Sequence, residues 1–188
     1  KEKSMKEKVD VYKEYCAGCG LCHSAEAVQY EYQNGFFKPE LHQNNFSFCE
    51  GVCPASGNWL KDIDPKKKWG KYINACVTWS SDPQLRFSAS SGGTITVISE
   101  YLLNKKLVDE IIHTCVSKQS QIKTEYTKSK SVDELRDKTG SRYTVSSPLI
   151  ELLQCISPEK KYAVVGKPCD ILVLRRYLDA HQELYKNI

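Results

Sequence analysis

Three cysteines at three-residue spacing stand near the start of the chain, in the stretch CAGCGLC at residues 16–22. Closely spaced thiols are typical ligands of zinc or of an iron–sulfur cluster. Short turns let three thiolates converge on one point, and Gly18 and Gly20 permit such turns. A site of this kind needs a fourth ligand, and the pair Cys53-Pro54 supplies a candidate.

The arithmetic of the cysteines decides how many clusters they can hold. In bacterial ferredoxins the spacing is C-x2-C-x2-C-x3-C-P, and the fourth cysteine of each motif ligates the other cluster. The first motif here has Glu26 in its fourth position, and the second motif keeps only Cys49 and Cys53. Cys49 is then a spare thiol or a substitute ligand. We predict one 4Fe-4S cluster, bound by Cys16, Cys19, Cys22 and Cys53.

A structural zinc ion is the alternative occupant of this site. Zinc also accepts four thiolates, but it usually takes them as two C-x2–4-C pairs. Cys49 and Cys53 would be the second pair, and one cysteine of the triplet would be idle. The triplet together with Cys-Pro favours the cluster. Three further cysteines lie within apolar stretches of the sequence and are interpreted as small core residues. They are Cys76, Cys115 and Cys155.

Length and composition limit the classes of protein. A chain of 188 residues has room for one core, or for a small module and one core of moderate size. No apolar run is long enough to span a bilayer, and a net charge of +4 from scattered lysines is too small to indicate nucleic-acid binding. Nine cysteines without a signal segment indicate a reducing compartment. We therefore expect a cytoplasmic protein with no nucleic-acid or membrane partner.

The residues that could do chemistry must be positioned by an α+β fold. Residues 1–14 alternate lysine and glutamate, which predicts a loose charged tail or a short exposed helix. Residues 15–71 are expected to form a small ferredoxin-like iron–sulfur module, with a hairpin turn at Asn34-Gly35 and a basic connector at 60–71. Residues 72–188 are expected to form an α/β domain with a mixed or parallel sheet.

Within the α/β domain, apolar periodicity predicts alternating elements. Ser131-Val-Asp-Glu134 is a capping box that opens a short helix ended by Gly140. A further strand is expected to begin at 185–188, which would leave the sheet incomplete. The other strands are expected at 73–79 and 108–116. The helices are expected at 94–106, 133–138 and 148–156. A strand, a turn and a helix are expected to follow one another over 160–180.

Three loops of this domain are candidates for binding a cofactor. The loop 88–94 precedes a helix, where N–H groups and hydroxyls receive a phosphate, or where the loop simply caps the helix. The turn 166–169 follows the next strand, and Lys167 would meet a phosphate or a flavin edge. Cys169 is expected to have a lowered pKa at the helix start, or to be a buried thiol. The loop 140–143 offers Arg142 for a pyrophosphate, or is a surface turn.

The ordered motifs of the chain resemble those of the coenzyme F420 hydrogenase/dehydrogenase beta-subunit family. They are CAGCGLC, Cys53-Pro54, SSGGTIT from residue 90, Val108-Asp109, GSRY from residue 140 and VVGKPCDI from residue 164. The resemblance implies a ferredoxin-like cluster module joined to an α/β domain that binds FAD. It implies electron passage between cluster and flavin, with the flavin converting single electrons into hydride transfer. A later segment of the family is absent, which implies truncation at the C-terminus.

The resemblance also implies partners and FAD contacts. The substrate would be coenzyme F420, another small molecule or a redox partner protein, and the chain would be a subunit of a larger complex. No catalytic residue is assigned. Two alternatives stay open: a noncatalytic zinc-stabilised binding module, and a cluster-only electron carrier. The implied FAD contacts are Ser90, Ser91, Gly92, Gly93, Thr94, Ser141, Arg142, Tyr143, Gly166, Lys167, Pro168 and Cys169.

Overall fold

The computed structural model describes residues 4–33, 36–42, 45, 47–57 and 72–188. The hairpin turn expected at Asn34-Gly35 and the basic connector expected at 60–71 lie outside these residues. The N-terminal part contains α1 Met5–Tyr15, α2 Leu21–Ser24, β1 Tyr30–Gln33, β2 Phe36–Pro39, α3 Ser47–Val52 and the 3-10 helix η1 Pro54–Ser56.

The rest of the described chain supplies one sheet and the helices around it. Its helices are α4 Pro83–Ser88, the 3-10 turn η3 Ser90–Gly93, α5 Thr94–Asn104, α6 Val132–Arg136, α7 Leu152–Cys155, α8 Pro168–Ala180 and η4 Gln182–Leu184. Its strands are β3 Glu110–Ser117, β4 Ser120–Ser129 and β5 Tyr162–Val164.

Helix α1 belongs to the N-terminal unit and is not a detached tail. Ser4 and Glu7 form a reciprocal capping box, in which Glu7 N donates to Ser4 Oγ at 3.3 Å and Ser4 N donates to the Glu7 carboxylate at 2.7 Å. Val9 and Tyr12 are buried against the chain that follows. The sequence analysis did not identify these two buried positions because the surrounding residues alternate lysine and glutamate.

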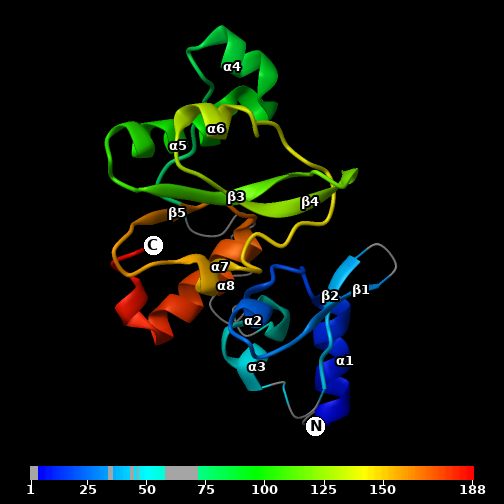
Figure 1. The fold of residues 1–188 in the computed structure, drawn as a ribbon. Helices are drawn as coiled ribbons and strands as arrows, with labels where there is room; N and C mark the ends of the chain where they lie inside the picture. The colour runs from blue at the N-terminus through cyan, green and yellow to red at the C-terminus, as the bar shows by residue number, and fades with distance from the viewer. Residues whose placement is uncertain (1–3, 34–35, 43–44, 46, 58–71) are drawn as a thin grey trace.

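The larger sheet is mixed, which confirms the α+β class. Its strand order is β4-β3-β5, with β3 antiparallel to β4 and parallel to β5. The hairpin β1–β2 pairs Tyr30 with Pro39 and confirms the predicted antiparallel pair. In Figure 1, α4, α5 and α6 lie on one side of the larger sheet, and α7, α8 and the N-terminal unit lie on the other.

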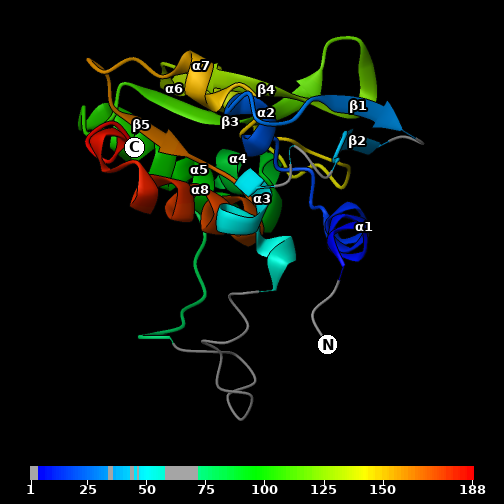
Figure 2. The ribbon, with the colours of Figure 1, turned by 90° about the horizontal axis from the view of Figure 1, so that it is seen from below.

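Several predicted elements differ from the structure. Residues 73–79 are not a strand: no described segment pairs with them, and Ile73 and Val77 are largely exposed. In Figure 2 this segment runs away from the sheet and the helices. The polar strand β4 and helix α4 were not predicted. The helix expected at 148–156 is shorter in the structure, where only α7 is helical, and residues 185–187 form a turn instead of the start of a strand.

The CAGCGLC turn is packed directly onto the α/β part. Leu21 is fully buried in one core with Ile112 of β3, Leu152 of α7 and Leu174 of α8. Leu149 N donates to the carbonyl of Cys19 at 3.0 Å, which fixes the turn against the residues before α7. The cysteine turn and the sheet are therefore parts of one hydrophobic core.

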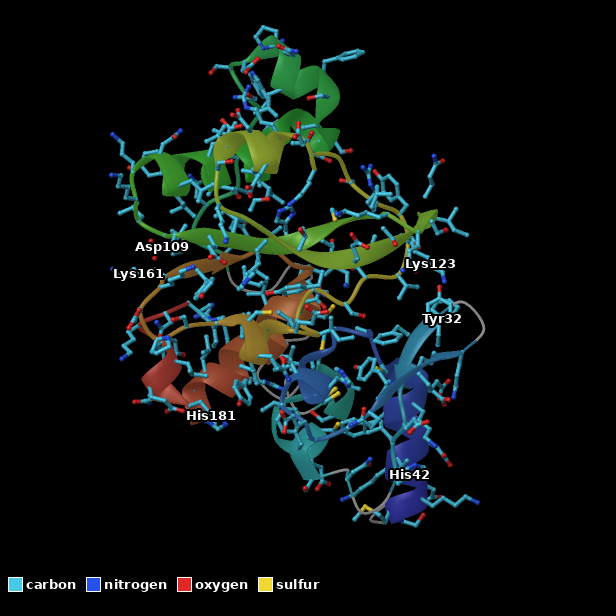
Figure 3. All side chains as sticks on the ribbon, viewed as in Figure 1. Tyr32, His42, Asp109, Lys123, Lys161 and His181 are labelled. Carbon is cyan, nitrogen blue, oxygen red and sulfur yellow. The ribbon has the colours of Figure 1, made fainter. Side chains whose placement is uncertain are left out.

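Side-chain contacts extend this attachment along the molecule. Ser24 Oγ donates to Gln154 Oε1 at 2.9 Å, and Gln154 Nε2 donates back to the Ser24 carbonyl at 2.7 Å. At the hairpin, the Lys123 ammonium of β4 lies 4.4 Å from the centre of the Tyr32 ring (Figure 3). None of the described helices has the length and apolar character of a membrane-spanning segment.

Gly20 is required for this docking. Its φ is +90°, and a Cβ at this position would lie 2.7 Å from Ile150 Cα. We expect Gly20→Ala to lower the free energy of unfolding by about 2–4 kcal/mol, from the left-handed backbone and the overlap together. Urea unfolding of the reduced protein measures this.

Gly51→Ala in α3 is the matched control, because a Cβ there meets nothing within 4 Å. We expect this variant to be as stable as the wild type or slightly more stable, since alanine is the better helix former. Equal stability of the two variants would contradict the docking argument.

Candidate functional site

Six cysteines line one small, mainly apolar cavity, and five of them belong to the N-terminal unit. Two come from the turn before α2, one lies in α2, one lies in α3, and one directly precedes η1. Tyr12, Tyr30 and Leu41 close the cavity around them. Figure 3 shows sulfur atoms beside α2. The five cysteines of the N-terminal unit are Cys16, Cys19, Cys22, Cys49 and Cys53, and the sixth is Cys169 of α8.

Backbone amides face the sulfur atoms of the four predicted ligands. Gly18 N donates to Cys16 Sγ at 3.4 Å. Amides of Leu21, His23 and Ala55 hydrogen-bond to the thiols of Cys19, Cys22 and Cys53, respectively, and each of these bonds lowers the pKa of its thiol. Such N–H groups favour the thiolate form, which is the form that binds metal.

Burial acts in the opposite direction on these thiols. Desolvation raises the pKa of Cys16, Cys19 and Cys53, and the other thiols of the cavity add to the rise. Hydrogen bonding between Cys22 and Cys49 lowers the pKa of Cys22 and raises that of Cys49. No lysine or arginine of the described residues lines the cavity, so thiolates in it would need a bound cation to balance their negative charge.

A zinc ion and a 4Fe-4S cluster require different spacings of the four sulfur atoms. Around one zinc ion with bonds of about 2.3 Å, tetrahedral sulfur atoms lie only about 3.8 Å apart. Within the described residues, no group of three or more cysteine, histidine or carboxylate side chains is arranged to hold a metal ion. In a 4Fe-4S cluster each thiolate binds a different iron, so the sulfur atoms surround a larger centre.

The other predicted core cysteines are less buried than expected. Cys76 is exposed, because the segment expected to be a strand does not enter the sheet. Cys115 and Cys155 are half-buried. His23 lies beside the cysteine turn with its Nδ1 buried and without a hydrogen-bond partner among the described residues.

A second, polar cavity of about 540 Å³ brings together the three candidate cofactor loops. Its volume falls within the range of roughly 300–1,000 Å³ typical of small-molecule sites. Of the twelve predicted FAD contacts, Gly92, Tyr143, Pro168 and Cys169 are not among the lining residues. Eight do line the cavity: Ser90, Ser91, Gly93, Thr94, Ser141, Arg142, Gly166 and Lys167.

The first loop places the start of α5 at this cavity. Ser91, Gly92 and Gly93 have φ values of +52°, +76° and +78°, a succession of left-handed residues that reverses the chain. A Cβ at Gly92 would lie 2.9 Å from Trp79 Cβ, so this residue packs against the preceding segment. Gly93 caps α5 without a side-chain hydrogen bond, which leaves the first-turn amides for an anion.

The other two loops are tied to the first and to each other. Ser141 N donates to Ser90 Oγ at 2.9 Å, which joins the loop of Arg142 to the start of α5. Lys167 Nζ donates to Ser146 Oγ at 3.0 Å and pairs with Asp170 at 2.9 Å. Asp170 is fully buried, so it neutralises much of the Lys167 charge.

The first turn of α8 lies between the two cavities. Lys167 and Asp170 line the polar cavity, whereas Cys169 and Val173 line the cysteine cavity. Burial and the Asp170 carboxylate raise the pKa of Cys169, so the prediction of a lowered pKa was wrong. The proximity of the helix start does not outweigh desolvation at this half-buried thiol.

Sequence reasoning missed the inner wall of the polar cavity. His113 of β3 and Lys138, which follows α6, both line it. His113 is 7% exposed, and its Nε2 lies 2.9 Å from Ser129 Oγ. Desolvation and the Lys138 charge lower the pKa of His113 to about 4. Sequence reasoning did not find this group because it did not predict β4, whose last residue is Ser129.

Comparisons with known proteins agree with these motifs. Residues 75–154 match the family described as coenzyme F420 hydrogenase/dehydrogenase, beta subunit N-term. An uncharacterized protein of Methanocaldococcus jannaschii is 26% identical over 165 residues, 86% of this chain and 44% of that protein. The F420-dependent formate dehydrogenase subunit beta of the same organism is 31% identical over 120 residues, 63% of this chain and 30% of that protein.

The family match covers only part of the chain. It includes the loops of Ser90–Thr94 and Ser141–Tyr143, and it ends before the turn that opens α8. The chain spans less than half the length of either relative. The family resemblance indicated by the ordered motifs is confirmed.

The buried neutral state of His113 predicts a pH dependence of stability. Its pKa is about 4 in the folded chain and 6.5 in the unfolded chain, so the unfolded state binds more protons between these values. The contribution of His113 is fully present above pH 6.5 and is lost as the pH falls toward 4. Between pH 7 and pH 5 the loss is about 2 kcal/mol.

Urea unfolding at both pH values measures this loss. We expect His113→Gln to remove most of that pH dependence, whereas the exposed His42→Asn retains it. A pH dependence that survives in His113→Gln would show that another group is responsible.

Proposed function

We propose that the chain is an iron–sulfur flavoprotein oxidoreductase, because residues 75–154 match the coenzyme F420 hydrogenase/dehydrogenase beta-subunit family. It passes electrons between one 4Fe-4S cluster, FAD and a substrate. The substrate is a deazaflavin such as coenzyme F420, or a redox partner protein. A relative named as a dehydrogenase subunit supports the further proposal that this chain works within a larger complex.

The observation that carries the proposal is the shared wall formed by α8. Cys169 and Val173 face the cysteine cavity, and Lys167 and Asp170 face the polar cavity, from consecutive turns of one helix. Two redox groups bound on either side would be separated by little more than this helix. A zinc-stabilised module or a cluster-only carrier gives no role to the polar cavity.

The residues of the cysteine cavity bind the cluster and exclude water from it. Cys16, Cys19, Cys22 and Cys53 supply thiolates, and the backbone amides that face them stabilise the negative charge. Tyr30 OH lies 3.5 Å from Cys22 Sγ and accepts a hydrogen bond from the Cys22 thiol when that thiol is protonated. Cys49 is a neighbouring thiol that is not required for a complete ligand set.

The residues of the polar cavity bind and orient a dinucleotide. The uncapped start of α5, the hydroxyls of Ser90 and Thr94, and the Arg142 guanidinium are donors for the two phosphates. When bound, FAD couples the single-electron chemistry of a cluster to two-electron hydride transfer. Lys167 is held by Ser146 and Asp170, so it is a positioned donor with little net charge.

Cysteine variants test the cluster ligands. After anaerobic reconstitution with iron and sulfide, we expect about four irons and four sulfides per wild-type chain. Cys53→Ser should lose most of this iron, because it removes the remote ligand. Cys49→Ser is the matched control in the same cavity and should keep it. Retention in Cys53→Ser with loss in Cys49→Ser would assign the fourth ligand to Cys49.

Titration with FAD tests the polar cavity. We expect quenching of flavin fluorescence on binding, and a dissociation constant about ten-fold larger in Arg142→Ala, since one charge-assisted phosphate contact is worth roughly 1.5 kcal/mol. Arg86→Ala is the matched control, because Arg86 is exposed on α4 and does not line the cavity. Equal affinities of the two variants would remove Arg142 from the site.

A further inference from the structure

Lys138 is a cation in the inner wall of the polar cavity. Its ammonium donates to Thr127 Oγ1 at 3.0 Å, to the Lys128 carbonyl at 3.1 Å and to Ser129 Oγ at 3.4 Å. These three acceptors are neutral and use all three of its hydrogens. Among the described residues, Lys138 forms no ion pair.

The neighbouring histidine adds no charge to this wall. An ammonium group only donates, so Ser129 Oγ accepts from Lys138 and its own hydrogen is free to donate to His113 Nε2 at 2.9 Å. His113 Nε2 is then an acceptor, and the ring is neutral with its hydrogen on Nδ1. The lowered pKa of His113 agrees with this assignment. The positive charge of the network is carried by Lys138 alone.

The other cations of the cavity have different surroundings. Lys167 is paired with the buried Asp170, which cancels much of its charge. Arg142 is exposed and lies next to Ser141, whose amide is bonded to the loop that starts α5. Arg142 therefore belongs with the phosphate donors. Lys138 is half-buried on the side formed by β3 and β4, where a positive charge is less screened by water.

We propose that Lys138 stabilises the negative charge that the flavin ring gains on reduction, and that Ser129 and His113 position its ammonium. This inference rests on the proposed function. Reduction of the ring by two electrons with uptake of one proton leaves one negative charge on the ring; the electrons come from the deazaflavin or the redox partner. A fixed cation near the ring makes the flavin easier to reduce.

Sulfite addition measures this effect without turnover. The sulfur lone pair of sulfite forms a bond to flavin N5, the N5–C4a double bond is lost, and the electron pair remains on the ring as negative charge; no group leaves. The adduct bleaches the visible flavin band, so titration of the FAD-loaded protein gives a sulfite dissociation constant. A cation that stabilises the reduced ring also stabilises this adduct.

Four variants make the test specific. We expect Lys138→Met to weaken sulfite binding at least about ten-fold and Lys138→Arg to stay within about three-fold of the wild type, because arginine keeps the charge. Ser129→Ala should weaken it about three-fold through misplacement of Lys138, and this variant carries the test if Lys138→Met does not fold. Lys118→Met, which removes an exposed lysine outside the cavity, should have no effect.

The outcomes separate this inference from the proposed function. Unchanged sulfite affinity in Lys138→Met and Ser129→Ala would overturn the inference while leaving the flavin site intact. A ten-fold loss of FAD affinity in Lys138→Met with unchanged sulfite affinity would show that Lys138 binds the diphosphate of FAD, and this result would also overturn the inference. Failure of the wild-type chain to bind FAD would overturn the proposed function itself, and the inference with it.

Discussion

The close packing of the CAGCGLC turn against residues 147–154 is the contact on which the arrangement of both cavities depends. Gly20 lies so near Ile150 that no side chain fits between them, and Leu21 enters the core formed by β3, α7 and α8. The same core positions the first turn of α8. The cysteine cavity therefore has its place beside α8 because the turn that supplies three of its thiols is part of the α/β core.

The two cavities differ in their electrostatic character. The cysteine cavity is apolar and collects thiols whose burial opposes ionisation, so a cationic iron centre would offset an unfavourable free energy. The polar cavity has the opposite character: uncapped amides, hydroxyls and cations that favour an anionic ligand. Between them, Asp170 on α8 satisfies Lys167, and Val173 on the next turn excludes water from the thiols.

The sequence predicted the parts with strong local signals. The five cysteines of the N-terminal unit do line one cavity, together with Cys169. The strand, turn and helix around VVGKPCDI were recognised because apolar periodicity changes there from strand to helix. The loops of Ser90–Thr94 and Ser141–Arg142 do meet in one cavity. Their assignment to FAD stays a prediction.

What failed depended on contacts distant in sequence. Residues 73–79 have a strand-like pattern but no partner strand among the described residues, so the pattern alone was misleading. The strand β4 was missed because it is polar and is defined by pairing with β3. Without β4, the sequence could not show that His113, Ser129 and Lys138 lie together. Of the two alternatives for Cys169, the raised pKa agrees with the buried thiol and not with a lowered pKa at the helix start.

The most direct test of the central claim is the visible absorption spectrum of protein purified without oxygen, recorded before and after addition of dithionite. The account predicts a brown protein with a broad sulfur-to-iron band that bleaches on reduction, together with resolved flavin bands when FAD is bound. A colourless protein that contains stoichiometric zinc, and that does not acquire these bands on reconstitution with iron, sulfide and FAD, would contradict it.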